Sequence, residues 1–126
     1  MNHAEAQEWL DRYVTAWRSN DPDEIGALFT EDVAYRYYPF STPVAGRNEV
    51  VQSWLDNPDE PESWEARYTP YAIQGDRVVA TGVSRYFAQG DQPEKTYRNC
   101  FLIEFDVDGN CSSFTEFFVK EPKRSA

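Results

Sequence analysis

Apolar and polar residues alternate along two neighbouring stretches, residues 97–105 and 112–119. An Asp-Gly pair at 108–109 lies between them, and such a pair between β-rich runs is a strong hairpin signal because both residues tolerate positive φ. A two- or four-residue loop centred on this pair places Phe101 opposite Glu116, whereas a three-residue loop would change the register. The pattern therefore predicts one long β-hairpin.

This register sorts the hairpin side chains onto two faces. The more apolar face has Glu116 near its middle, and no cation stands directly opposite it. Its members are Tyr97, Asn99, Phe101, Ile103, Phe105, Phe114, Glu116 and Phe118. The other face carries an apolar strip, which we call the outer strip, of Cys100, Leu102, Phe117 and Val119.

Helical spacing of apolar residues predicts an amphipathic helix over residues 4–18, with an aromatic stripe along one side. Asp21 as N-cap and Pro22 at the first helical position predict a short second helix. A third helix is predicted after Gly46. The residues expected to face inward from the three helices are Trp9, Tyr13, Trp17, then Ile25, Leu28, Phe29, then Val50, Val51, Trp54 and Leu55.

Further strands are predicted at residues 33–38, 64–73 and 77–87. Pro70 marks a bulge or an edge position in the second of these, because proline cannot donate to a ladder. Between the third helix and this strand, residues 57–62 form an acidic linker that is expected to be a solvated connection. The order of elements predicts an α+β fold, with helices on one face of a curved antiparallel sheet, in a single domain spanning residues 1–126.

Composition limits the classes of partner that this protein is expected to bind. The formal net charge of -10 and pI near 4.4 argue against binding to nucleic acid or to an anionic membrane surface. The one basic cluster is a short tail at residues 120–124. No apolar run approaches the roughly 20 residues of a membrane span, and the N-terminal residues are polar where a signal peptide is apolar. The sequence predicts a cytoplasmic protein.

Cysteine and histidine are scarce. Cys100 and Cys111 are separated along the predicted hairpin and are expected to be reduced thiols. The single histidine, His3, leaves no His/Cys cluster for zinc or a two-histidine iron site. We therefore predict neither a metal nor a cofactor.

Four segments together resemble the NTF2-like superfamily, and within it the SnoaL-like relatives of polyketide cyclases. They are RYVTAW at 12–17, ALFTEDV at 27–33, GRNEVV at 46–51 and the hairpin at 97–118. The resemblance implies an NTF2-like cone, in which three N-terminal helices pack on a strongly curved mixed or antiparallel sheet around an apolar pocket. It also implies a homodimer through the outer sheet face. Ketosteroid isomerases, dehydratases, cyclases, epoxide hydrolases and domains without known activity share this fold, so the fold does not fix the chemistry.

Tyr13 falls where the ketosteroid isomerases carry the tyrosine that donates to the substrate oxygen. Those enzymes also use an aspartate base at the end of the first strand and a protonated aspartate on the hairpin. This chain has Tyr37 and Tyr38 in the first region, and Asn99 and Phe101 in the second. The Asp-Arg-Asp arrangement of the related epoxide hydrolases cannot be assembled either. The alternative for Tyr13 is a purely structural aromatic between helix and sheet.

Glu116 is the sharpest catalytic candidate. A carboxylate among phenylalanines is partly desolvated, which raises its pKa and suits proton transfer near neutral pH. With Tyr13 and Asn99 as donors to a carbonyl oxygen, Glu116 would support a cyclase, isomerase or dehydratase reaction. The alternatives are an ion pair with an arginine from another element, for which Arg36, Arg47 and Arg85 are available, or a position near the open rim of the cone.

Aromatic residues on the predicted inner surfaces are expected to bind a small apolar or carbonyl-containing molecule. The predicted ligand-binding residues are Trp17, Tyr37, Trp54, Tyr97, Phe101, Phe114 and Phe118. The competing hypothesis is a non-catalytic ligand-binding or dimeric interaction domain whose own aromatics fill the cavity. In either case the outer strip predicts a homodimer.

Overall fold

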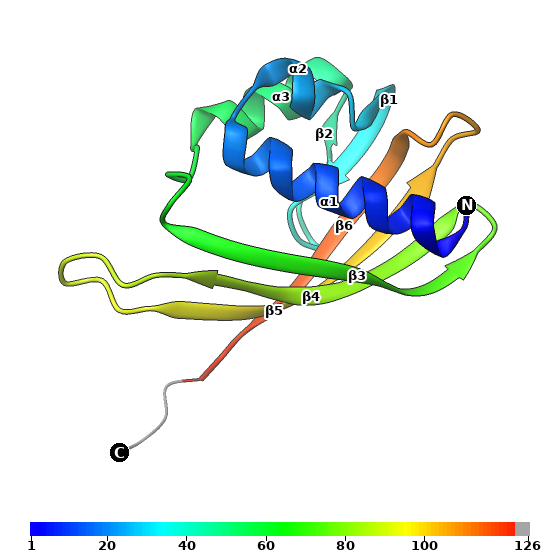
Figure 1. Ribbon diagram of the computed structural model, residues 1–126. Helices are drawn as coiled ribbons and strands as arrows, with labels where there is room; N and C mark the ends of the chain where they lie inside the picture. The colour runs from blue at the N-terminus through cyan, green and yellow to red at the C-terminus, as the bar shows by residue number, and fades with distance from the viewer. Residues whose placement is uncertain (123–126) are drawn as a thin grey trace.

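The computed structural model describes residues 1–122, which form helices packed against one six-stranded sheet (Figure 1). The elements are α1 (His3–Ser19), α2 (Pro22–Gly26), β1 (Phe29–Arg36), β2 (Val44–Ala45), α3 (Arg47–Asp56), β3 (Trp64–Gln74), β4 (Arg77–Tyr86), β5 (Lys95–Phe105) and β6 (Cys111–Lys120). Residues 123 and 124 of the predicted basic tail lie outside the described residues. Within residues 1–122, no helix has both the length and the apolar character needed to span a membrane.

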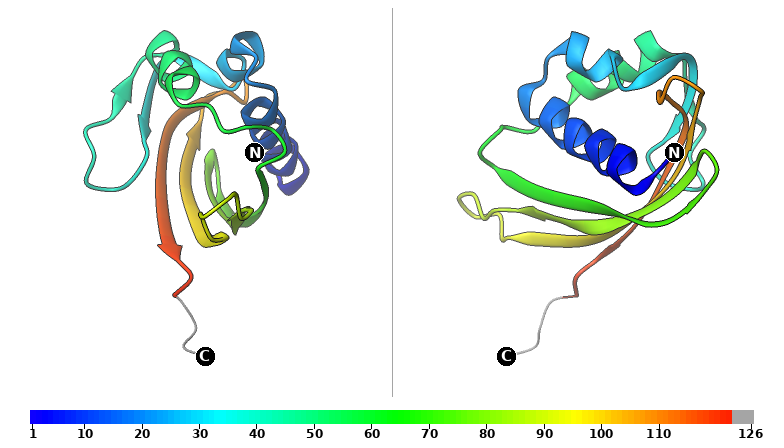
Figure 2. Two further views of the ribbon diagram at one scale, coloured as in Figure 1. Left: turned by 90° about the vertical axis from the view of Figure 1, so that its left-hand side faces the viewer. Right: turned by 45° about the vertical axis from the view of Figure 1, so that its right-hand side comes forward.

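The sheet has the strand order β2-β1-β6-β5-β4-β3. The β1–β6 pair is parallel and the other neighbours are antiparallel, so the sheet is mixed. It bends strongly, and α1 lies across its concave side while α2 and α3 lie near β1 (Figure 2). The predicted α+β architecture with three helices is confirmed. Its concave side is the surface on which a site can form.

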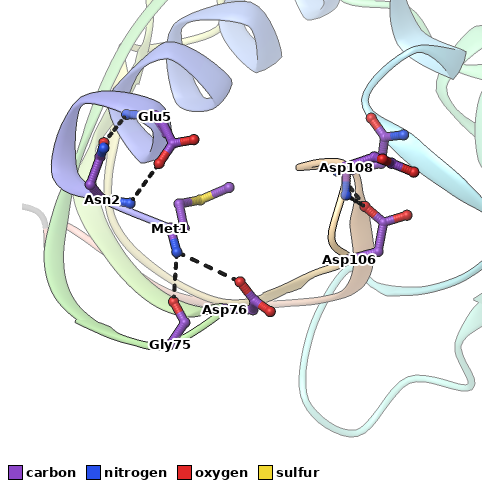
Figure 3. Close-up of polar contacts among 8 residues, drawn as sticks. Met1, Asn2, Glu5, Gly75, Asp76, Asp106 and Asp108 are labelled. Atoms are coloured by element: carbon purple, nitrogen blue, oxygen red, sulfur yellow. Dashed lines mark hydrogen bonds and ion pairs between the residues drawn. The ribbon is translucent and has the colours of Figure 1, made fainter.

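The start of α1 is fixed by local hydrogen bonds (Figure 3). The Asn2 side chain accepts from the backbone N–H of Glu5 at 2.8 Å, and the Glu5 carboxylate accepts from the backbone N–H of Asn2 at 3.0 Å. This reciprocal capping box satisfies two donors that a helix start leaves unpaired. The ammonium of Met1 adds a tertiary contact, because it donates to the Gly75 carbonyl at 3.1 Å and lies 3.6 Å from the Asp76 carboxylate.

The apolar stripe of α1 forms the centre of the core, as its spacing predicted. Trp9 is 2% exposed and stands edge-on to Phe105, with ring centroids 5.2 Å apart. Its indole N–H donates to the Leu28 carbonyl at 3.1 Å, which also ties α1 to the chain after α2. Tyr13, one turn further on, stacks on Phe114 with ring centroids 5.4 Å apart. The core therefore extends directly to the ring of Tyr13.

The predicted register of the C-terminal hairpin is confirmed. Phe101 pairs with Glu116 across β5 and β6. The loop itself spans residues 106–110, and the Asp106 carboxylate holds it by accepting from the backbone N–H groups of Asp108 and Asn110 (Figure 3). Five loop residues alone would shift the register, but the ladder also shifts by one residue next to Phe105. This bulge restores the pairing that the sequence predicted.

The first two strands differ from prediction, and the strand expected at residues 33–38 spans Phe29–Arg36 instead. The second helix was expected to bury Phe29 on its inner face, but α2 ends at Gly26 and Phe29 begins β1. The physical reason is the parallel ladder: Phe29 pairs with Cys111, and the Cys111 N–H donates to the Leu28 carbonyl at 2.9 Å. The two-residue strand β2, which pairs with β1, was not predicted.

Pro70 lies at a position where the sheet does not need a backbone N–H donor. Strand β3 is at the edge of the sheet, and its ladder with β4 shifts register between Pro70 and Ala72. Both expectations for this proline, an edge and a bulge, are confirmed.

Candidate functional site

Two cavities adjoin on the concave side of the sheet. The inner chamber has a volume of about 420 Å³ and reaches Tyr13 and Trp54. The outer chamber has a volume of about 610 Å³ and reaches the turn between β4 and β5. Five residues line both chambers: Tyr37, Asp59, Ser84, Tyr86 and Glu116. Glu116 therefore stands at their junction.

A chain of hydrogen bonds holds the Glu116 carboxylate. Asn99, on the neighbouring strand, donates from Nδ2 to Glu116 Oε2 at 2.6 Å. The Ser84 hydroxyl donates to Asn99 Oδ1 at 3.0 Å, which fixes the orientation of the amide. Both Ser84 and Asn99 are buried. Burial raises the pKa of Glu116 from 4.5 to about 7, although the Asn99 hydrogen bond works in the opposite direction.

None of the arginines proposed as ion-pair partners contacts Glu116. Arg36 donates to the Ser41 carbonyl, Arg47 donates to the Phe29 carbonyl, and Arg85 pairs with glutamates at the edge of the sheet. Within residues 1–122, Glu116 takes part in no ion pair. The structural ion-pair explanation therefore has no cation in the described part of the chain.

Tyrosines surround this carboxylate. The hydroxyls of Tyr13 and Tyr35 are 2.8 Å apart and share a hydrogen bond, so one of the two protons is available for another acceptor. Burial, the largest effect, raises the pKa of both phenols, and the nearby charge of Glu116 raises it further. Burial and then the charge of Glu116 also raise the pKa of Tyr37 and Tyr68, and for Tyr86 burial is followed by the charges of Asp59 and Glu116. Near neutral pH these phenols are neutral hydrogen-bond donors.

The predicted site residues divide among three places. Those that line the inner chamber are Tyr13, Trp17, Tyr37, Trp54 and Glu116. Those that line the outer chamber are Tyr37, Tyr97, Asn99, Glu116 and Phe118. Phe101 and Phe114, expected on the pocket wall, line neither chamber. They are 1% and 0% exposed and pack on Tyr13 behind the wall, where they support the site without reaching the cavity.

Sequence reasoning missed several lining residues. Tyr35 is not one of them: it belongs to the tyrosine-rich run at residues 35–40, for which the sequence allows either a pocket lining or packing under the helices, and it lines the inner chamber. Tyr68 and Tyr86 required the pairing of β3 with β4, which alternation alone does not give. Asp59 left no signal: it belongs to the linker that was expected to be a solvated connection. Instead it lines both chambers and accepts a hydrogen bond from Trp17 Nε1 at 3.0 Å.

Neither Cys100 nor Cys111 lines either chamber. Among the described residues, no group of three or more His, Cys, Asp or Glu side chains is arranged to hold a metal ion. Both cysteines are free, and burial raises the pKa of the Cys111 thiol, which keeps it protonated.

A family model described as "SnoaL-like domain" matches residues 10–114, which is most of the chain. The chain belongs to the SnoaL-like domain family. No curated protein matches the sequence of this SnoaL-like chain.

Solved structures share the fold of the SnoaL-like chain at low sequence identity. An epoxide hydrolase of M. tuberculosis, described as LEH-like, is 16% identical with a TM-score of 0.68, over 93% of this chain and 84% of that one. An NTF2-like protein of unknown function from Cytophaga hutchinsonii is also 16% identical with a TM-score of 0.68, over 90% and 98%. A proposed ketosteroid isomerase from Kribbella flavida is 20% identical with a TM-score of 0.68, over 98% and 84%. These likenesses show that the chain has the NTF2-like fold.

The residues that line the cavity of this SnoaL-like chain also differ from those that the epoxide hydrolase and isomerase mechanisms require. No arginine lines either chamber in the described residues, so an Asp-Arg-Asp arrangement has no counterpart there. In the regions where the resemblance places the isomerase base and second donor, the chain has Tyr37 and Tyr38, and Asn99 and Phe101. The distinctive group of this site is the carboxylate of Glu116.

Proposed function

We propose that this protein is a cofactor-free acid/base enzyme of the cyclase, isomerase or dehydratase type, acting on a small, mostly apolar carbonyl compound. One observation carries the proposal: Glu116 is a carboxylate with a pKa of about 7, unpaired with any cation in residues 1–122, at the junction of two chambers. A base whose pKa lies near the working pH is well matched to proton transfer.

The step common to these reactions is removal of a proton from a carbon next to a carbonyl group. In the proposal, the Glu116 carboxylate takes that proton, and the electrons of the broken C–H bond move toward the carbonyl oxygen to give an enol or enolate. In an isomerisation, protonated Glu116 returns the proton to a different carbon. In a cyclisation, the enolate carbon forms a bond to a second carbonyl carbon, whose oxygen takes the proton. In a dehydration, the C–O bond of a hydroxyl group breaks, and the hydroxyl takes the proton and leaves as water. The base is thereby regenerated at the end of each cycle.

The phenols of Tyr13 and Tyr35 supply the complementary role. Because their raised pKa keeps them neutral, the proton not used between them can be donated to the substrate oxygen as negative charge develops there. Asn99, expected from the sequence as a second donor to the substrate, already donates to Glu116. We therefore assign Asn99 to holding the base and the tyrosine pair to polarising the oxygen.

A non-catalytic ligand-binding or dimeric domain is the second candidate. Exposed apolar residues of the outer strip favour the dimer, since Leu102 is 44%, Phe117 41% and Val119 72% exposed. The version in which aromatics fill the cavity has less support. An inner chamber of about 420 Å³ exceeds the space of a few waters, each of which takes roughly 30 Å³ in the liquid.

The experiment begins with a thermal-shift screen of polyketide-like and steroid-like ketones. For each stabilising ketone, exchange of the carbon-bound protons next to the carbonyl with D₂O is followed by NMR. We expect the parent to catalyse exchange and E116Q to be slower by about 10²- to 10⁴-fold. E104Q is the matched control: it neutralises a carboxylate on the adjacent strand that lies outside both chambers, and should behave as the parent.

The titration of Glu116 gives a readout that needs no substrate. Carbon-detected NMR of its side-chain carboxyl should show a midpoint near 7. A midpoint at the ordinary value of 4.5, or exchange by E116Q as fast as by the parent, would refute the acid/base proposal.

A further inference from the structure

The outer chamber contains a cation that the proposed chemistry does not use. Lys95 lines this chamber and is half-buried. No other lysine or arginine lines either chamber in the described residues, and Lys95 takes part in no ion pair there. Lys95 is thus a cation that lines a cavity without an ion-pair partner among the described residues, in a protein of formal net charge -10.

Lys95 belongs to the row of side chains that leads to Glu116. It is the first residue of β5 and alternates onto the same face as Tyr97 and Asn99, all of which line the outer chamber. Across the ladder it pairs with Tyr86, another lining residue. Asn99, at the inner end of the row, donates to Glu116. The four residue steps from Lys95 to Asn99 span roughly 13 Å of strand.

The distance between Lys95 and Glu116 sets the shape of a molecule that contacts both residues. A carbonyl compound reacting at Glu116 and reaching Lys95 must be elongated, such as a linked two-ring acid or a medium-length keto acid. The side chain of Lys95 is a compact point charge, which suits a single anionic group. Asp59 lines the same chamber and would repel a doubly charged phosphate more than a singly charged carboxylate.

We propose that Lys95 binds the carboxylate of the substrate at the outer end of the cavity, so that the substrate is an elongated organic acid carrying its reactive carbonyl at the other end. This inference rests on the proposed function for the location of the reacting carbon. The binding of the carboxylate itself is independent of catalysis and can be measured alone.

The test uses three probes of one shape and different charge: biphenyl-4-carboxylate, biphenyl-4-carboxamide and biphenyl-4-ylmethylammonium. Their dissociation constants are measured by calorimetry against the parent, K95M, K95R and R98M. Arg98 is the matched control, because it neighbours the same row on β5 but does not line either chamber. R98M and K95M change the net charge equally.

We expect the carboxylate to bind the parent and K95R about five-fold more tightly than the amide, in keeping with one partly exposed ion pair. The preference should disappear in K95M and persist in R98M. Equal binding of acid and amide, tighter binding of the ammonium, no binding of the carboxylate at millimolar concentration, or a preference that survives in K95M would each overturn the inference. An equal loss of this preference in K95M and R98M would also overturn it, because it would show that only the long-range effect of net charge is involved.

The two proposals fail in different measurements. If Glu116 titrates at its ordinary pKa while K95M abolishes the carboxylate preference, the acid/base function is refuted and the anion site stands. If Glu116 titrates near 7 and E116Q loses exchange activity while K95M binds as the parent does, the enzyme stands and its substrate is not an acid held by Lys95.

Discussion

Replacing Glu116 with glutamine should change how the stability of the fold depends on pH. Glutamine has nearly the same shape and retains an acceptor for the Asn99 amide, so the packing around position 116 is conserved. The difference is that glutamine carries no titratable proton. The difference in unfolding free energy between the parent and E116Q therefore measures the cost of keeping a titratable carboxyl group buried in this cavity.

The magnitude follows from the pKa of Glu116 in the two states. Its ordinary value of 4.5 describes the unfolded chain, and burial raises it to about 7 in the folded protein. The folded state thus holds the proton more tightly, so the stabilising contribution is complete below pH 4.5 and is lost as the pH rises to about 7. At about 1.4 kcal/mol per pH unit, the loss amounts to about 3 kcal/mol.

The assay is urea denaturation of the parent, E116Q and E104Q from about pH 4 to about pH 8. We expect E116Q and the parent to have similar stability at the acid end, and E116Q to be more stable by about 3 kcal/mol at about pH 8. E104Q should follow the pH dependence of the parent. If the curves of E116Q and the parent run parallel across the whole range, Glu116 does not titrate abnormally and the reasoning fails.

Two further predictions concern the sheet. A Cβ at Gly82 would lie 2.0 Å from the Arg67 carbonyl oxygen, a backbone atom that cannot yield cheaply, so G82A should lower the free energy of unfolding by about 2–3 kcal/mol in urea denaturation. G26A, whose Cβ would meet only ordinary contacts, should be near neutral, and a similarly small effect of G82A would contradict the argument. We also expect a homodimer through the outer strip in sedimentation at micromolar concentration, and a monomer for L102D; a monomeric parent would contradict this expectation.

Local patterns were enough to predict the hairpin and the long helix. The Asp-Gly signal and the alternation around it gave the pairing of Phe101 with Glu116, because register follows from the turn and the period of two. The turn itself was not predicted, since a longer loop and a compensating bulge produce the same pairing. Pro70 has no N–H to donate, and this property alone correctly predicted the irregularity at the edge of the sheet.

Contacts between segments distant in sequence could not be predicted in the same way. Phe29 was predicted on a helix because its spacing from Ile25 fits a helical face, and a parallel ladder with Cys111 makes it a strand residue instead. The tyrosine pair at the site has the same origin: Tyr13 was a candidate from its helix, but its hydroxyl partner Tyr35 comes from a strand 22 positions away. Neither partnership leaves a periodic signal, so neither could be predicted from one sequence.

The position of β6 in the sheet has a consequence for synthesis of the protein. The last strand lies between β1 and β5, so β1, made early, has no neighbour on that side until residues 111–120 have left the ribosome. Until then the two parts of the sheet cannot join, and Trp9 and Tyr13 on α1 lack their ring contacts with Phe114. Such distant pairings slow folding and expose apolar surface to other chains in the meantime. A nascent chain truncated before β6 should therefore depend on chaperones more than the finished protein does.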